Sequence, residues 1–358
     1  MTAAAIISAA VVFLVAGVDL GRIGSLDLLC FWVSGKIFRD GGNPYDIATY
    51  ASYMAAYGRE IDPQVPLLVW HPPWVYTYLW IFAFVDLRLF IALWRLFTLA
   101  AFIVSHELLQ ASLARKQTTT SSADALAQER TLKTLRLLFW LTFYPALLTF
   151  WLGQMTPLLL LFLCSGLFCL SRDNLSAKYG FAGGALIGMT FTKPHLLYLV
   201  YLFLFADNLR QKRWSVIFGF LAGFALLALA PLLLSPGIYI DYFAVFGQLP
   251  VYWDTPTLGG LLDKICGYQH RWLKFLPTVA ALLSAAVLIV RYFGVSRWRR
   301  EILYLLIPIS LFSTPYCWVY DYVLMFPVLV WLIFQLQAHW RSGSRLREVF
   351  SLSLALLL

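Results

Sequence analysis

The sequence predicts an all-α polytopic membrane protein, a single domain over residues 1–358 built from about ten transmembrane helices. Three observations predict this class. Of the 358 residues, 61% are hydrophobic, 17% aromatic and only 13% charged, more apolar surface than a water-soluble globule can bury. Several apolar runs approach the roughly 20 residues that cross about 30 Å of hydrocarbon. The basic residues behind the net charge of +9 gather between these runs, which indicates membrane topology rather than a nucleic-acid partner.

The apolar runs give the positions of the helices. The run 3–18 lacks a basic leading segment and a small-residue cleavage site, so we expect a retained helix rather than a cleaved signal. The two runs on either side of Lys193-Pro194 are too short to cross comfortably, and such interrupted segments usually line a site. The expected spanning helices are 3–18, 88–111, 135–151, 155–171, 180–192, 194–206, 214–234, 273–293, 301–316 and 319–337.

Clusters of Lys and Arg mark the cytoplasmic side. They lie at 115–136, 172–178, 210–213, 291–300 and 341–347. The polar segment 116–129 is then a cytoplasmic linker, 338–358 a cytoplasmic tail or the start of a further helix, and the connections 19–87 and 235–272 lie outside. The apolar run 67–85 cannot cross without moving the basic segment 115–136 to the wrong face, so we expect a re-entrant or interfacial segment, rich in tryptophan and tyrosine.

The first outer connection carries a candidate catalytic carboxylate. Residues 26–39 alternate apolar side chains with Ser34, Lys36 and Arg39, which predicts a short amphipathic helix on the bilayer surface. The turn sequence 41–46 ends this helix. Asp27 therefore lies where a lipid headgroup and an acceptor can meet, although a helix cap or a solvated carboxylate is an alternative explanation.

Six motifs follow one another along nearly the whole chain. They are Asp27 with Phe31-Trp32; Gly42-Asn43-Pro44-Tyr45-Asp46; His71-Pro72-Pro73; Gly153-Gln154; Lys193-Pro194-His195; and Thr314-Pro315-Tyr316 with Trp318-Val319-Tyr320-Asp321. In this order they resemble glycosyltransferase family 87 of the GT-C fold, which includes polyprenol-phosphate-mannose-dependent mannosyltransferases. Two positions depart from the family: His71 replaces the usual Tyr, and Asp254-Thr255-Pro256-Thr257 stands where the family often has an Asn-Gln-Ser-like stretch.

The resemblance implies a reaction and roles for the matched residues. Asp27 would be the general base that takes the proton of the acceptor hydroxyl. One carboxylate suffices for direct displacement with inversion, whereas retention would require a second one as nucleophile. Lys193, an intramembrane charge, would bind the phosphate of the donor unless it reaches to the surface. His195, His270 and Arg271 are further candidates for binding this phosphate.

The remaining candidates would bind the sugar or the acceptor, each beside a structural alternative. They are Asp46, which can instead stabilise its turn; His71; Gln154, which can belong to a helix hairpin; Trp318 and Tyr320, which can anchor the membrane interface; and Asp321, which can pair with Lys193.

The implied partners are a polyprenyl-phosphate-linked donor that carries a hexose, with mannose as the family's best-known case, a lipid or glycan acceptor, and the lipid bilayer. We expect a multi-pass inner-membrane protein whose active site faces the periplasm or cell exterior. No cofactor is expected, because the outer carboxylates form no D-x-D pair and the five cysteines show no metal-ligand spacing. The main alternative is a transporter or flippase of lipid-linked sugar. It would require charges deep in several helices, and the acidic residues instead crowd one face.

Overall fold

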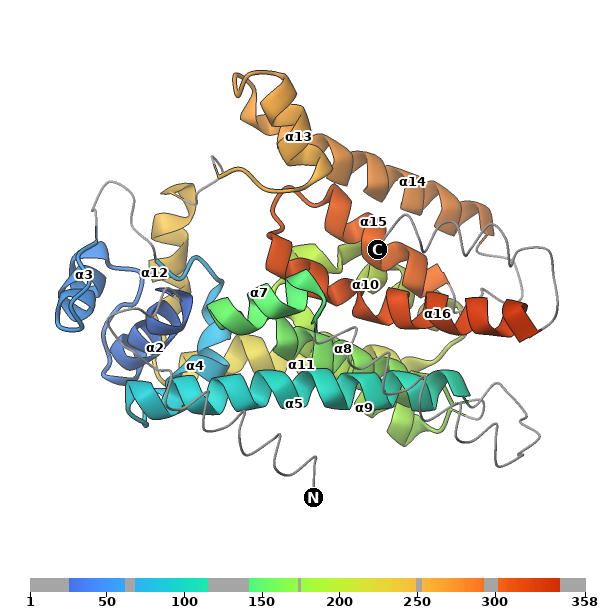
Figure 1. Ribbon diagram of the computed structural model, residues 1–358, viewed down its shortest axis with the longest axis horizontal. Coiled ribbons are helices and arrows are strands. Elements are labelled where there is room, and N and C mark those ends of the chain that lie inside the picture. The colour runs from blue at the N-terminus through green and yellow to red at the C-terminus, as the bar shows by residue number, and fades with distance from the viewer. Residues whose placement is uncertain are drawn as a thin grey trace.

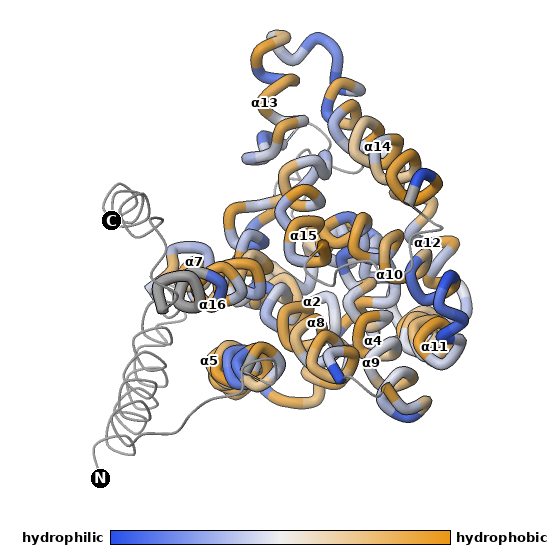
Figure 2. The backbone as a smooth tube through the Cα atoms, turned by 90° about the vertical axis from the view of Figure 1, so that its right-hand side faces the viewer, coloured by the Kyte–Doolittle hydropathy of each residue, from blue (hydrophilic) through white to orange (hydrophobic). Residues whose placement is uncertain are grey.

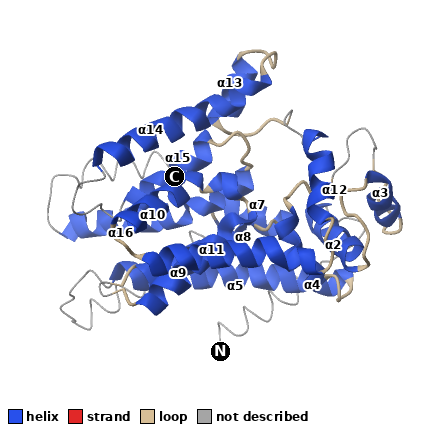
Figure 3. Cartoon of the chain, turned by 180° about the vertical axis from the view of Figure 1, so that it is seen from behind, coloured by secondary structure: helices blue, strands red, loops and turns tan. Residues whose placement is uncertain are grey.

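The computed structural model describes residues 26–61, 68–114, 142–172, 175–248, 253–292 and 302–341, and within these ranges it contains only helices and loops (Figure 3). The predicted helix 3–18, the linker 116–129, the first part of helix 135–151 and the tail beyond 341 lie outside the described residues. The all-α prediction is therefore confirmed for the described part of the chain.

The helices follow one another in this order: α2 (Leu26–Arg39), α3 (Ile47–Ala55), η1 (Pro73–Val75), α4 (Tyr76–Phe82), α5 (Leu87–Ala114), α7 (Tyr144–Leu152), α8 (Thr156–Leu170), α9 (Ala177–Met189), η2 (Thr190–Thr192), η3 (Pro194–Leu196), α10 (Tyr198–Arg210), α11 (Trp214–Leu229), η4 (Ala230–Leu233), α12 (Ile238–Val245), η5 (Phe246–Gln248), α13 (Leu258–Ile265), η6 (Arg271–Phe275), α14 (Leu276–Tyr292), α15 (Ile302–Ser313), η7 (Val319–Met325) and α16 (Phe326–Arg341). The elements labelled η are short 3-10 helices.

Three described helices are long and apolar enough to cross a membrane. They are Leu87–Leu113, Trp214–Leu233 and Arg271–Arg291, which match the predicted spans 88–111, 214–234 and 273–293. Their outward side chains are apolar: Val287 of α14 is 64% exposed and Val290 is 79% exposed. A continuous apolar face of this kind is stable against lipid and not against water. The apolar helices Thr156–Leu170, Ile302–Ser313 and Val319–Gln335 are shorter.

The long helices run along the long axis of the molecule. Figure 1 shows α5 along most of this axis, with α2, α3, α4 and α12 gathered at the end where α5 begins. Viewed along the axis in Figure 2, apolar residues dominate the bundle, and hydrophilic residues collect in the connection between α13 and α14, which stand apart from the rest. One apolar core lies among α5, α8, α10, α15 and α16, and a second surrounds α2 and α4.

Helices α9 and α11 approach each other closely because glycines face each other across the contact. A Cβ on Gly184 would lie 2.1 Å from the carbonyl oxygen of Val216, and a Cβ on Gly219 would lie 2.1 Å from that of Phe181. Small residues spaced four apart allow membrane helices to pack backbone against backbone. The α9–α11 pair therefore provides a rigid base for the segment that follows α9, which contains η2, Lys193 and η3.

The helix predicted at 26–39 is present as α2, but it is not an amphipathic helix on a surface. It is buried on nearly all sides, with Leu28, Val33 and Ile37 fully covered. The apolar run that follows residue 67 folds over it: the Trp32 Nε1–H donates to the Val85 carbonyl at 3.0 Å. This run forms only η1 and α4, and the seven residues of α4 span about 10 Å, too short to cross. The sequence pattern concealed this because the covering segment is distant in sequence.

Candidate active site

A cavity of about 810 Å³ lies beside the second apolar core, and Cys30, Phe31, Leu68, Val69 and Tyr242 of that core line it. Its wall combines α2, the segment before α4, the hairpin between α7 and α8, the junction between η2 and η3, α12, and the segment that leads into η7. Seven of the residues predicted from the sequence line it: Asp27, His71, Gln154, Lys193, His195, Tyr320 and Asp321. The fold thus brings together positions that are almost 300 residues apart in the chain.

Gln154 connects the predicted base to the predicted phosphate-binding cation. Its Nε2–H donates to Asp27 Oδ2 at 2.5 Å, and its Oε1 lies 3.4 Å from Lys193 Nζ. The preceding Gly153 ends α7 with φ +71°, and a Cβ there would lie 2.1 Å from the side chain of Leu28. A glycine is therefore required for the hairpin to turn and to rest on α2, which places Gln154 beside Asp27.

Lys193 lies at a break in a helical segment. Its φ and ψ of −130° and 78° separate η2 from η3, and Pro194 has no N–H to continue a helix. The side chain is buried and its Nζ donates to Asp321 Oδ1 at 2.8 Å. The ammonium also lies 5.0 Å from the ring centroid of Tyr320, a distance that allows a cation–π interaction.

Asp321 is held by donors from three parts of the chain. Its Oδ1 accepts a hydrogen bond from Thr156 Oγ1 at 2.6 Å in addition to that from Lys193, and its Oδ2 accepts one from the Trp318 backbone N–H at 3.1 Å. The carboxylate is 1% exposed. A buried carboxylate needs such partners, so Asp321 fixes the ammonium of Lys193 rather than facing the cavity alone. Sequence reasoning proposed this pairing but did not identify Thr156, which no local motif distinguishes.

The environment shifts the pKa values of two groups in the cavity wall outside the predicted spans. Burial raises the pKa of Asp27, while the hydrogen bond from Gln154 and the charge of Lys193 act in the opposite direction. Burial lowers the pKa of His71 well below its usual range, and the positive charge of Lys193 adds to this. His71 is therefore a neutral imidazole, and Asp27 is a more basic carboxylate than one in water.

Several polar atoms in the wall lack a hydrogen-bond partner among the described residues. They are Trp70 Nε1, His71 Nδ1, Trp74 Nε1 and His195 Nε2, all buried. Buried donors and acceptors are rarely left unpaired, and here they surround a space that can hold a polar ligand. Hydroxyl and phosphate oxygens of a ligand would satisfy them.

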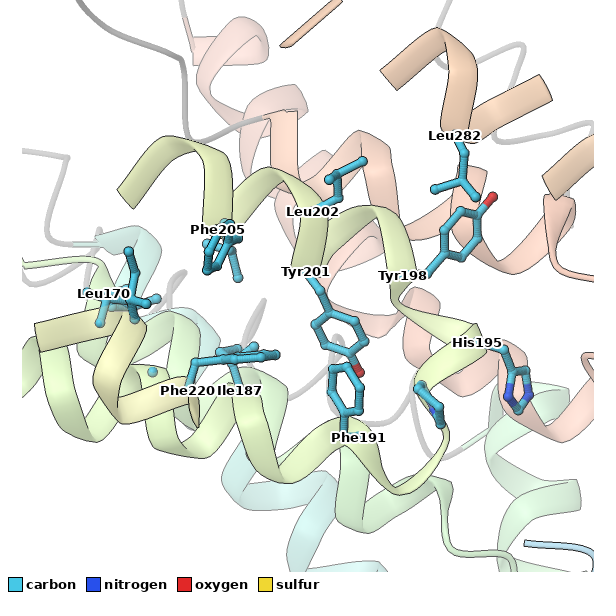
Figure 4. Close-up of a pocket in the computed structure, with 15 residues that line it drawn as sticks. Leu170, Ile187, Phe191, His195, Tyr198, Tyr201, Leu202, Phe205, Phe220 and Leu282 are labelled. Atoms are coloured by element: carbon cyan, nitrogen blue, oxygen red, sulfur yellow. The ribbon is translucent and has the colours of Figure 1, made fainter. Parts of the chain in front are cut away.

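A second cavity of about 570 Å³ adjoins the first (Figure 4). It lies among α9, α10, α11 and Leu282 of α14, and its lining is almost entirely apolar and aromatic. Pro194 and His195 belong to both cavities, so the helix break at Lys193 lies between the cavity that contains the charged groups of Asp27 and Lys193 and a cavity lined almost entirely by apolar and aromatic residues.

Four predicted residues do not line the large cavity. Asp46 caps α3, where its Oδ2 accepts a hydrogen bond from the Thr49 N–H at 2.8 Å, the structural alternative considered from the sequence. Trp318 lies behind Tyr320, with ring centroids 6.3 Å apart. His270 is exposed, and Arg271 donates to Asp263 at 2.7 Å. The described residues contain no group of three or more His, Cys, Asp or Glu that could hold a metal ion.

Comparison with known proteins agrees with the resemblance in the motifs. A family model, Glycosyltransferase family 87, matches residues 70–314, more than half of the chain. The match includes His71, Gln154, Lys193 and His195 and leaves Asp27 and Asp321 outside. No curated protein and no solved structure matches the chain. The chain belongs to glycosyltransferase family 87.

Proposed function

We propose that this glycosyltransferase moves a hexose, mannose by resemblance, from a polyprenyl-phosphate donor to the hydroxyl of a lipid or glycan acceptor, with inversion. The observation that supports this most directly is the chain of contacts from Asp27 through Gln154 to Lys193. It sets a carboxylate with a raised pKa and a buried ammonium in the wall of one cavity. Membership in a glycosyltransferase family favours transfer over the transporter alternative.

The proposed step is a single displacement. Asp27 accepts the proton of the acceptor hydroxyl. At the same time, the oxygen of that hydroxyl forms a bond to the anomeric carbon. The bond from that carbon to the phosphate oxygen breaks, and the electron pair leaves with the polyprenyl phosphate. Lys193 has three N–H donors; Asp321 and Gln154 engage two, and the third is available to the departing oxygen. His195 and His71, neighbours in the same wall, add donors for the phosphate and the sugar.

The second cavity supports a lipid-linked donor. An isoprenoid chain leaving the phosphate beside Lys193 would meet Pro194 and His195 and then apolar walls. Burying such a chain contributes about 0.8 kcal/mol for each methylene removed from water. Leu282 of α14, one of the three helices that can span a membrane, lines this cavity.

We propose a GT-C-like bundle of about ten spanning helices whose cavity opens to the periplasm or cell exterior. The described ends of α5, α14 and α16 lie at the opposite end of the molecule from α2 and α3, and the basic clusters begin there (Figure 1). The test of orientation is Thr120→Cys in a Cys266→Ser background, because the native Cys266 is exposed in the connection expected outside. The cysteine at 120 should react with an impermeant maleimide only after the membrane is opened. Labelling of intact cells would reverse the orientation.

The proposed reaction is tested by transfer of radiolabelled mannose from polyprenyl-phosphate-mannose by the purified protein in lipid nanodiscs, with total membrane lipid extract as acceptor. Asp27→Asn should lower the rate about 10²–10⁴-fold, the usual contribution of a general base. Lys193→Ala should also lose activity. Asp46→Asn is the matched control, because asparagine caps α3 equally well. Full activity of Asp27→Asn would refute the assignment of the base.

A further inference from the structure

A buried ion pair lies beneath the segment that closes one side of the large cavity. Asp263 of α13 is 0% exposed and Lys274 of η6 is 2% exposed, and their charged atoms are 3.6 Å apart. Arg271 donates to the same Asp263 oxygen at 2.7 Å. Charges are buried at a cost unless they are paired, so this arrangement requires an explanation.

Lys274 connects this ion pair to the wall of the cavity. Its Nζ donates to the backbone carbonyl of Trp253 at 2.6 Å, and Trp253 lines the cavity. The segment between Trp253 and α13 is not helical, and hydrogen bonds hold it to other elements: Tyr268 donates to Asp254 at 2.9 Å, Thr255 to the Pro315 carbonyl at 3.3 Å, and Tyr322 to the Pro256 carbonyl. The charge-assisted bond from Lys274 thus restrains the backbone of Trp253.

Close backbone packing holds η6 against α13. Gly259 of α13 rests against η6, where an added Cβ would lie 2.2 Å from the Lys274 carbonyl oxygen. Helix α13 begins at the capping Thr257, whose Oγ1 accepts from the Gly260 N–H. The contact between the two elements thus places Lys274 beside Asp263, and the same ammonium donates to Trp253.

The indole of Trp253 belongs to a connected set of aromatic rings. It stacks on Tyr316 with centroids 6.3 Å apart and planes at 28°, and it meets Trp318 at 5.8 Å. Trp318 in turn stacks on Tyr320, whose ring lies beneath the ammonium of Lys193. We name Trp253, Tyr316, Trp318 and Tyr320 the aromatic wall. It leads from the outer segment to the proposed phosphate-binding cation.

We propose that Lys274, held by Asp263, is a positioning residue that fixes Trp253 as the stacking surface for the transferred sugar. This inference rests on the proposed function. A pyranose presents a face of C–H groups, and an indole is a large rigid surface for it. Such a contact is made equally in the ground state and the transition state, so it contributes to donor affinity and little to the chemical step.

Lys274→Met removes the restraint while it keeps most of the side-chain volume. The KM for polyprenyl-phosphate-[³H]mannose should rise about tenfold, with kcat changed less than twofold, the pattern of lost uniform binding. Lys274→Arg keeps the charge and the donors and should recover most of the affinity. Asp263→Asn should resemble Lys274→Met. The matched control is Lys264→Met, which removes an exposed lysine from α13, the helix that carries Asp263.

A second measurement separates positioning from activity. Protein labelled with 5-fluorotryptophan gives a fluorine resonance for Trp253, assigned by its loss in Trp253→Phe. Lys274→Met should move or broaden this resonance, Lys274→Arg should restore it, and Lys264→Met should leave it unchanged. This signal requires no turnover. If no sugar is transferred from the donor, the proposed function is refuted, and the resonance still tests whether Lys274 positions Trp253.

The double variant Trp253→Ala/Lys274→Met completes the test. If Lys274 acts through Trp253, the second substitution adds no further rise in KM, because residues that act as a unit are not additive. Two independent rises that multiply would overturn the inference. An unchanged Trp253 resonance in Lys274→Met would overturn it as well.

Discussion

Replacement of Gln154 by methionine tests the electrostatic coupling at the centre of the cavity. The Gln154 Nε2–H donates to Asp27 Oδ2 at 2.5 Å, and hydrogen bonds to charged groups contribute about 1.5–3 kcal/mol. This bond favours the ionised carboxylate, so its loss raises a pKa that burial has already raised. At 1.36 kcal/mol for each unit, the Asp27 pKa should rise by about one to two units.

The expected consequence is a shift of the acid limb of the pH–rate profile. A base must be ionised, so kcat/KM falls as the pH drops below its pKa, and in Gln154→Met this fall should begin about one to two units higher. The assay measures kcat/KM for mannose transfer over a range of pH, with difference infrared spectra of the Asp27 carboxyl assigned by Asp27→Asn. The exposed Gln248→Met is the control. An acid limb and a carboxyl titration that both stay in place would refute the reasoning.

Three further predictions follow from the packing. Lys193→Met leaves Asp321 buried without its cation and should lower the free energy of unfolding in detergent by about 3–5 kcal/mol, and adding Asp321→Asn should cost less than the two single changes together; additive costs would contradict the pairing. Gly219→Ala forces α9 from α11 and should lower thermal stability by about 1–3 kcal/mol, whereas Gly247→Ala, with open space around it, should not. Leu202→Trp fills the apolar cavity and displaces about two chain methylenes, worth about 1.6 kcal/mol, so KM should rise about tenfold for a long-chain donor and stay unchanged for a two-isoprene donor; equal effects on both donors would contradict the chain site.

The sequence predicted the structure best where a local property of the residues, such as apolar length or the absence of an N–H in proline, is enough to determine the local structure. Apolar length alone located the three helices that can span a membrane. The proline after Lys193 indicated the helix break, because proline cannot continue a helix. The Gly153-Gln154 motif was recognised without its reason, which is the close approach of the hairpin to Leu28.

The remaining features depend on contacts between segments far apart in the chain. Burial of α2 required knowing that the run after residue 67 folds over it, and periodicity carries no information about a distant cover. Lys274 resembles an ordinary helix-end lysine until Trp253, 21 residues earlier, returns beside it. Arg271 was assigned to phosphate from its charge, whereas its position beside Asp263 is set by the tertiary fold.

The helix break at Lys193 also determines the depth at which a lipid-like ligand can bind. Along an uninterrupted helix, the depth at which a lipid-like molecule binds could change with the thickness of the surrounding bilayer. The shared wall of Pro194 and His195 instead marks one level, with the charged groups of the large cavity on one side and the apolar cavity on the other. A molecule with a charged headgroup and an apolar chain can therefore bind across the two cavities in only one position. In the proposed reaction, the protein rather than the membrane would then set the position of the anomeric carbon of the donor.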